Sequence, residues 1–383
     1  MSANLAVTRR IHEGMRIEVS GGVSSFLLMM GLSVVGGPGC GDDPPTITLH
    51  ARGAAMVAVD TGAGWEPRAA GDVTFSEPDG VYRLAVVCRA DVGFARFDVA
   101  APGDATEYAR DCTPAVAATE VVTFDVRGDV YGIFIGDVAT YTGTSALVAP
   151  GTYDVVATVD DGFANTVRAQ VIRDVVVNGP TTITIDVAGA GQSLEDLELR
   201  AEPPVERQQV TGVTRRGTWF QLAAPTPRRL PPALRVAGDV HTLRASRWIT
   251  DGADHGRRAE RAIVIADDSR VIDATLVDSG ETVTYAADPA PTVTWSSTDG
   301  WTAVTLSVAQ LNEVALPAWM LGATPAALAR GAVLAMPDRP PGWQAAWDVD
   351  PAGGFQWTSA LFRDHDDGGW DALRTGGSVQ AGR

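Results

Sequence analysis

The chain of 383 residues carries 47 acidic residues against 30 basic ones, which gives a formal net charge of −17. Every basic residue is an arginine, so the sequence excludes lysine chemistry such as a Schiff base or a lysine nucleophile. A negative field of this size repels polyanions, and the arginine doublets are scattered among turn residues, so we expect no nucleic acid partner.

Residues 1–40 have the pattern of an export signal. Arg9, Arg10 and Arg16 precede an apolar stretch at residues 23–35, which has the length of a signal core and is too short for an ordinary membrane span. We therefore expect residues 1–40 to form a leader that directs the rest of the chain out of the cytoplasm.

The leader ends at Cys40, which follows Gly-Pro-Gly and precedes a flexible acidic segment. This arrangement resembles the signal of bacterial lipoproteins, and the resemblance implies cleavage before Cys40 and lipidation of this cysteine. An ordinary secretory signal, cut nearby, is the alternative. Both Met1 and Met15 could serve as the start of the signal.

The two remaining cysteines, Cys88 and Cys112, form an even pair with no second cysteine or histidine cluster beside either. In an exported protein such a pair favours a disulfide over a metal site or a nucleophile. A loop of this length is stabilised by about 3 kcal/mol on the loop-entropy model. Two buried free thiols are the alternative.

The first half of the chain after the leader reads as short strands bounded by Gly, Pro, Asp or Asn. Helical patterns of the length needed for a parallel α/β fold are missing from residues 46–200. The predicted strands lie at residues 46–49, 82–88, 94–99, 121–124, 153–159 and 182–187. This spacing predicts an all-β fold built from sandwiches.

A weak internal repeat divides this half into two modules. Residues 47–53 align with residues 122–128, and residues 78–82 align with residues 150–153. In each module a Pro and a Gly precede a Tyr that opens a strand, so we expect the ring in the core and the hydroxyl at a wet corner. The repeat predicts β-sandwich modules at residues 41–118 and 119–200.

The segment at residues 147–157 resembles the carboxypeptidase-regulatory-like and prealbumin-like β-sandwich families. Members of these families are mostly non-catalytic attachments. The resemblance implies small Ig-like or prealbumin-like sandwiches and assigns no functional residue.

Residues 201–383 differ in composition, because nine of the ten tryptophans lie between Trp219 and Trp370. We expect a larger Trp-rich β domain here, with hairpins around residues 296–300 and 351–354 and a short helix at residues 325–330. The helix would have Thr324 as its N-cap and Gly331 as its stop. Its predicted strands lie at residues 261–265, 282–285, 292–295, 301–306 and 355–362.

The sequence contains no nucleophile elbow, zinc-protease motif, phosphate loop or dinucleotide fingerprint, and we predict no catalysis and no cofactor. Asp364, Asp366 and Asp367 are candidate Ca²⁺ ligands, because a hard cation takes several carboxylate oxygens and the following glycines permit a tight turn. A solvated acidic hairpin tip is the alternative interpretation.

Trp343, Trp347 and Trp357 are candidates for a glycan platform, because exposed aromatic rings on a sheet can stack on sugar rings. Burial in the core is the alternative for these rings.

Together these features predict an exported and lipid-anchored envelope protein, in the outer membrane or outside the cell, with a structural or binding role. Its partners would be the membrane, through the anchor, and an envelope protein or glycan. The alternative is a secreted hydrolase or glycan-binding protein that uses carboxylates or tryptophans of the C-terminal domain.

Overall fold

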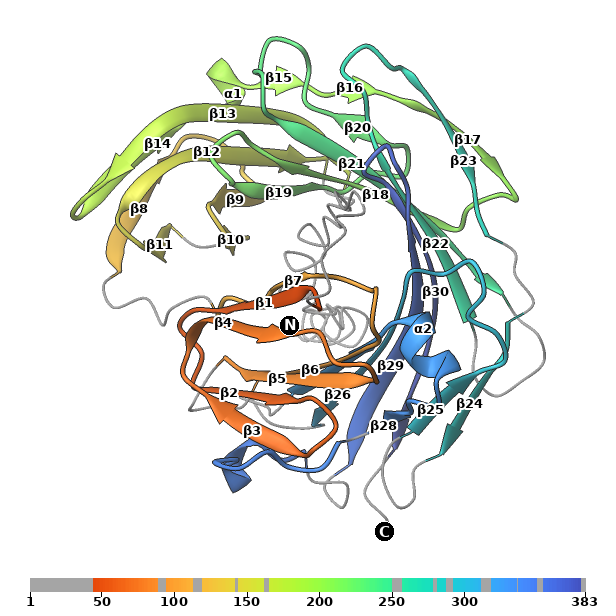
Figure 1. Cartoon of the computed structure of the whole chain (residues 1–383). Coiled ribbons are helices and arrows are strands. Elements are labelled where there is room, and N and C mark those ends of the chain that lie inside the picture. The colour runs from red at the N-terminus through yellow and green to blue at the C-terminus, as the bar shows by residue number, and fades with distance from the viewer. Residues whose placement is uncertain are drawn as a thin grey trace, which may run out of the picture.

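The computed structural model describes residues 44–88, 94–112, 119–141, 144–161, 165–249, 257–277, 281–286, 292–310, 318–335, 337–349 and 354–379. In these ranges the chain is almost entirely β, with short helices only, so the all-β prediction is confirmed. The leader and Cys40 lie outside the described residues. Figure 1 shows the strands arranged in a broad arc.

The first unit, residues 46–109, has two layers of strands. The smaller layer has the order β4-β1-β7, with β1 antiparallel to β4 and parallel to β7, and the larger has the order β3-β2-β5-β6. Alternation along β1 buries Ile47 and Leu49 between the layers. The strands are β1 Thr46–Ala51, β2 Met56–Asp60, β3 Trp65–Arg68, β4 Gly71–Ser76, β5 Tyr82–Val87, β6 Phe94–Ala100 and β7 Glu107–Ala109.

The second unit, residues 120–185, repeats this topology. Its smaller layer has the order β11-β8-β14, again antiparallel on one side and parallel on the other, and its larger layer begins β10-β9-β12-β13. The elements are β8 Glu120–Val126, β9 Gly132–Ile135, β10 Val138–Thr140, β11 Ser145–Val148, β12 Gly151–Asp160, β13 Thr166–Val177 and β14 Thr181–Ile185, followed by α1 Val187–Ala190 and β15 Gln192–Ser193. β15 pairs antiparallel with β13 and adds a fifth strand to the larger layer.

The third unit, residues 195–275, has the same plan. β17 pairs in parallel with β23, β16 pairs with β20, and the larger layer has the order β19-β18-β21-β22. The strands are β16 Glu195–Asp196, β17 Glu198–Glu202, β18 Arg207–Val213, β19 Trp219–Leu222, β20 Arg228–Arg229, β21 Val240–Ile249, β22 Arg257–Val264 and β23 Val271–Thr275.

The fourth unit, residues 283–379, keeps the larger layer, β27-β26-β29-β30, and has a smaller layer of β24-β25-β28. Thr324 caps α2 by accepting a hydrogen bond from the Ala327 amide at 3.1 Å, which confirms the predicted helix start. The elements are β24 Val283–Ala286, β25 Thr292–Trp295, β26 Ala303–Gln310, β27 Ala318–Ala323, α2 Pro325–Ala329, β28 Leu334–Ala335, the 3-10 helix η2 Ala345–Trp347, β29 Phe355–Asp364 and β30 Trp370–Val379.

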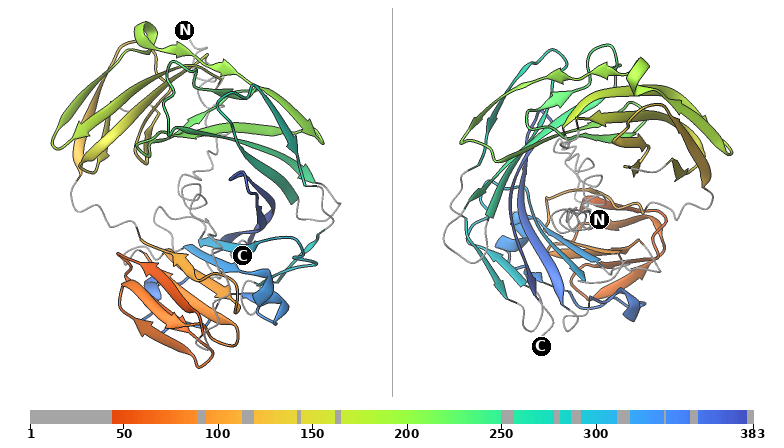
Figure 2. Two further views of the ribbon diagram at one scale, coloured as in Figure 1. Left: turned by 45° about the horizontal axis from the view of Figure 1, so that its top comes forward. Right: turned by 180° about the vertical axis from the view of Figure 1, so that it is seen from behind.

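Three of the larger layers join into one sheet of twelve strands, in the order β19-β18-β21-β22-β30-β29-β26-β27-β6-β5-β2-β3. The joints are an antiparallel pairing of β22 with β30 and a parallel pairing of β27 with β6. The spatial order of these three units is therefore first, fourth, third. Figures 1 and 2 place the first and second units at the two ends of the arc.

The joint between the first and fourth units explains why β5 is apolar from Leu84 to Val87. Leu84 and Val86 pack under the smaller layer of the first unit, whereas Ala85 and Val87 pack into the core of the fourth unit. A strand that is buried on both faces needs no polar alternation.

The predicted internal repeat aligns equivalent strands, since β1 corresponds to β8 and β5 to β12. The predicted domain boundaries fit less well. The boundary between residues 200 and 201 falls inside β17, and residues 201–383 hold most of two units. The strand pairing also carries the first unit into the same sheet as the third and fourth, because β6 leaves an edge that β27 completes.

Two details of the sequence prediction are wrong. β25 and β26 do not form a hairpin around residues 296–300, because β25 pairs with β24 and β28 in another layer. The Tyr82 hydroxyl is not at a wet corner, since it lies buried at 2.8 Å from the Tyr108 hydroxyl. Residues 351–353 of the second predicted hairpin lie outside the described residues, and the following strand β29 pairs with β26 and β30.

Candidate functional site

The structure joins Cys88 and Cys112 by a disulfide, with their Cα atoms 5.0 Å apart. Cys88 directly follows β5, and Cys112 lies three residues beyond the end of β7. The bond therefore ties the larger layer of the first unit to the segment that leaves its smaller layer, which is a role in folding rather than in chemistry.

The candidate Ca²⁺ ligands lie at the hairpin tip between β29 and β30. Asp367 accepts a hydrogen bond from the Gly369 amide at 2.9 Å, Asp364 lies 3.3 Å from the Thr302 hydroxyl, and Asp366 is exposed. Within the described ranges, no three His, Cys, Asp or Glu side chains come together as metal ligands. At this acidic hairpin tip, Asp367 is engaged in closing the turn.

The three candidate tryptophans do not form an exposed platform. Trp347 and Trp357 are only 1% and 2% exposed. Trp343 packs edge-on against Trp347, with ring centroids 5.4 Å apart, and Trp357 stacks on Tyr285 at 4.3 Å. Burial in the core, the other interpretation of these rings, agrees with the structure, because the loop at residues 337–349 folds over the joint of the first and fourth units, where large rings fill the core.

A different group of polar side chains gathers at the joint of the third and fourth units. Glu260 on β22 is fully buried, and three arginines surround its carboxylate. Arg244 donates from Nη2 at 2.6 Å and Arg374 from Nε at 2.7 Å, while Arg258 Nε lies 3.3 Å from the other oxygen. We call Arg244, Arg258, Arg374 and Glu260 the inner-face cluster.

Electrostatics keep Glu260 ionised. Burial opposes the charge, but the cations of Arg374 and Arg244 outweigh it, and the pKa of Glu260 is lowered. Burial lowers the pKa of the Arg374 guanidinium, and repulsion from Arg244 and Arg258 acts in the same direction. The cluster holds three positive charges against one negative charge.

A second group lies on the opposite face of the same strands. Asp371 on β30 accepts from Arg261 Nη1 at 2.9 Å and from Arg363 Nη2 at 2.6 Å, and His365 Nε2 lies 3.0 Å away. Burial opposes the charge, but the hydrogen bonds from Arg363 and Arg261 lower the pKa of Asp371. This carboxylate on β30 accepts hydrogen bonds from arginines on β22 and β29 and so links three neighbouring strands.

The other buried carboxylates of the described chain are also paired with arginines. Asp98 lies between Arg110 and Arg96, which overcome its burial and bring its pKa to about 2. Asp154 and Asp239 share Arg173. The pKa values of Asp98 and Asp239 are lowered, so these two carboxyl groups stay ionised near neutral pH and are unsuited to act as general acids.

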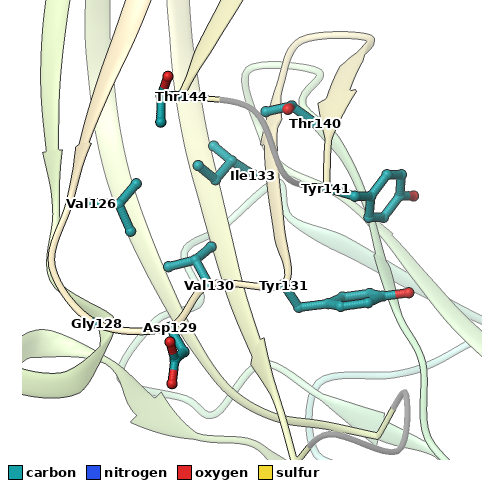
Figure 3. Close-up of a pocket in the computed structure, with 9 residues that line it drawn as sticks. All are labelled: Val126, Gly128, Asp129, Val130, Tyr131, Ile133, Thr140, Tyr141 and Thr144. Atoms are coloured by element: carbon teal, nitrogen blue, oxygen red, sulfur yellow. The ribbon is translucent and has the colours of Figure 1, made fainter. Parts of the chain in front are cut away.

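A shallow pocket of about 250 Å³ opens in the second unit (Figure 3), and another of about 420 Å³ lies on the third unit beside Glu198 and Pro227. Tyr131 and Tyr141 form the rim of the pocket in the second unit, with ring centroids 5.6 Å apart, and Asp129 is the single charged residue in its lining. Val130 and Ile133 supply its apolar floor. The pocket carries no pair of groups suited to acid and base chemistry.

Comparison with models of protein families, with curated proteins and with solved structures finds no match to this chain. Among the described helices, none has the length and apolar character needed to cross a bilayer.

The sequence analysis missed the inner-face cluster. Its arginines lie on three strands that are separated by more than a hundred residues at the extremes, so no local motif marks them. The available signal was the alternation in β22, where Arg258 and Glu260 occupy the same face of an otherwise core-forming strand.

Proposed function

We propose that this chain is an exported envelope protein, anchored by a lipid on Cys40, that acts as a structural or binding component without catalysis. The leader pattern and the cysteine after its apolar stretch support export and anchoring. The disulfide between Cys88 and Cys112 suits an oxidising compartment outside the cytoplasm.

The non-catalytic role rests on the state of the buried carboxylates. Glycoside hydrolysis needs one carboxyl group with a raised pKa and a second one that is ionised nearby. Within the described residues, Asp364 is the carboxylate whose pKa burial raises, and its hydrogen-bond partner is the Thr302 hydroxyl. The deeply buried carboxylates are instead paired with arginine, as expected for a scaffold.

The repeated sandwich plan also supports a scaffold. Four units of similar strand order, three of which share one sheet, give an extended surface. Extended repeats of this kind are typical of structural and binding proteins.

Metabolic labelling with a palmitate analogue tests the anchoring. The wild type should take up the label and fractionate with membranes, whereas Cys40→Ala should do neither. The double variant Cys88→Ala/Cys112→Ala is the matched control, because it removes the other two sulfurs and should keep the label. An unprocessed amino terminus on a soluble cytosolic protein with reduced Cys88 and Cys112 would contradict the proposal.

A further inference from the structure

The inner-face cluster lies on the side of the twelve-stranded sheet that faces the inside of the arc. The strand register from β30 through β29, β26, β27 and β6 to β5 places Arg374 on the same face as Leu84, which packs under β1 and β7. Figures 1 and 2 show β1 and β7 on the inner side of the arc, with no described element over the inner face of β21, β22 and β30. The cluster is therefore presented inward, at the middle of the sheet.

The three arginines are accessible although their carboxylate is not. The side chains of Arg244, Arg258 and Arg374 are 29%, 24% and 18% exposed, while that of Glu260 is 0% exposed. The hydrogen bond from Arg374 to Glu260 uses Nε. Its two Nη groups therefore have no carboxylate partner among the described residues, and they remain available to an anion.

The positive charge exceeds what the joint requires. Arg374 alone links Glu260 across the β22–β30 pairing, and Arg244 pairs with it from β21. Arg258 lies 3.3 Å from the other carboxylate oxygen and donates from Nη2 to the Ser246 hydroxyl at 2.9 Å, so one carboxylate serves three cations. An excess of cations at a half-buried place is costly unless an anion joins it. In a chain of net charge −17, this cluster is a local site of the opposite sign.

Aromatic rings flank the arginines on the same face. Register places Trp248, Arg258 and Arg374 side by side on β21, β22 and β30, and Trp248 is 45% exposed. The Trp370 ring lies under both Arg244 and Arg374, 5.5 and 5.8 Å from their guanidinium carbons. With strands about 4.8 Å apart, a ligand lying across them would meet an aromatic face and then two guanidinium forks within about 10 Å.

This combination selects a ring that carries a carboxylate. Guanidinium forks bind carboxylates in bidentate fashion, and the open face of an aromatic ring packs on the apolar face of a sugar. A second copy of the chain would bring mainly negative charge without a sugar ring, and a neutral glycan would leave the arginines without a counterion.

We propose that the inner face at the joint of the third and fourth units binds an acidic polysaccharide of the uronic acid type, through Arg258, Arg374 and Trp248. The inference rests on the proposed binding role and names its ligand class. The carboxylates of successive sugars engage the arginines, and one sugar ring stacks on Trp248.

Affinity electrophoresis of the purified full chain through gels containing polygalacturonate tests this inference at low ionic strength. The wild type should be retarded by polygalacturonate and not by neutral dextran. Arg258→Gln should weaken the binding at least about tenfold, as expected for the loss of one charge-assisted contact. Raising the salt from about 0.01 M to 0.15 M should also weaken it, because the Debye length falls from about 30 Å to 8 Å.

Two further variants separate binding from folding. Trp248→Ala removes an exposed ring without touching the ion pairs, and it should weaken binding about threefold with an unchanged melting temperature. Arg200→Gln is the matched control, because Arg200 is 61% exposed and lies on β17 in an exposed pair with Glu198. This control should bind as the wild type does.

Several outcomes would overturn the inference. The inference fails if polygalacturonate does not retard the protein, or if dextran retards it equally. It also fails if polyglutamate retards it equally and Trp248→Ala has no effect, or if single-stranded DNA binds more tightly. Free galacturonate should compete at least tenfold more weakly than the polymer, and equal competition would show a site for single sugars instead. Failure of these tests with normal lipid labelling of Cys40 would refute the ligand class while leaving the proposed anchoring intact.

Discussion

The buried histidine of the third unit should make the stability of the protein depend on pH. His241 is 3% exposed, packs edge-on against Phe220 with ring centroids 5.7 Å apart, and has a buried Nε2 without a hydrogen-bond partner. Burial lowers its pKa to about 4, with nearby Arg235 acting in the same direction. The imidazole is therefore neutral in the folded protein at pH 7.

The sign and size follow from the difference between the folded and unfolded states. An unfolded histidine has a pKa of about 6.5. Between this value and about 4, the unfolded chain binds a proton that the folded protein does not, so stability falls as the pH falls through that window. The whole lowering corresponds to about 3 kcal/mol, and about 2 kcal/mol of it should be lost between pH 7 and pH 5.

Urea unfolding followed by tryptophan fluorescence at pH 7 and pH 5 measures this loss. The variant His241→Leu removes the titrating group and should lose about 2 kcal/mol less than the wild type over the same interval. The matched control His50→Gln alters a partly exposed histidine beside Asp72 and leaves His241 in place, so it should keep the additional loss. If the wild type and His241→Leu lose the same free energy, the buried imidazole is not responsible for the pH dependence.

Three other changes should alter stability. Glu260→Gln leaves three arginines without their anion and should lower the free energy of unfolding in urea by about 3–5 kcal/mol. A loss below about 1 kcal/mol would show that water already solvates the three arginines. Gly212→Ala would place a Cβ 2.1 Å from Cζ of the buried Phe220, and it should cost about 1–3 kcal/mol by forcing the ring to move. An unchanged melting temperature would mean that the ring has room to shift. Replacing Cys88 and Cys112 by serine should cost about 3 kcal/mol, and equal unfolding curves for wild type and variant without reductant would contradict a structural role for the bond.

Local patterns predicted the elements of this fold well. The strand predicted at residues 46–49 and the Thr-Pro helix start at residues 324–325 are read from neighbours in the sequence, and β1 and α2 lie there. Cys88 and Cys112 were paired from their number and surroundings alone, and the structure joins them.

Pairings between distant segments could not be predicted in this way. The joint of β6 with β27 connects residues more than two hundred positions apart, and nothing within either strand specifies the other. The repeat in the sequence did not include the third and fourth units, because their strands keep the topology without similar residues. The sequence could not decide between a glycan platform and burial for the same reason, since the burial of Trp347 depends on the neighbouring first unit.

The place of the fourth unit also has a consequence for biosynthesis. The first and third units are translated before residues 303–379, which lie between them in the sheet and complete the free sides of β6 and β22. Until that last segment leaves the ribosome, both strands expose unpaired amides and carbonyls that can recruit a strand from another nascent chain. A message cut short before this region would yield a product with two unpaired strand edges, so we expect folding to depend on chaperones that keep the unfinished polypeptide apart from its copies.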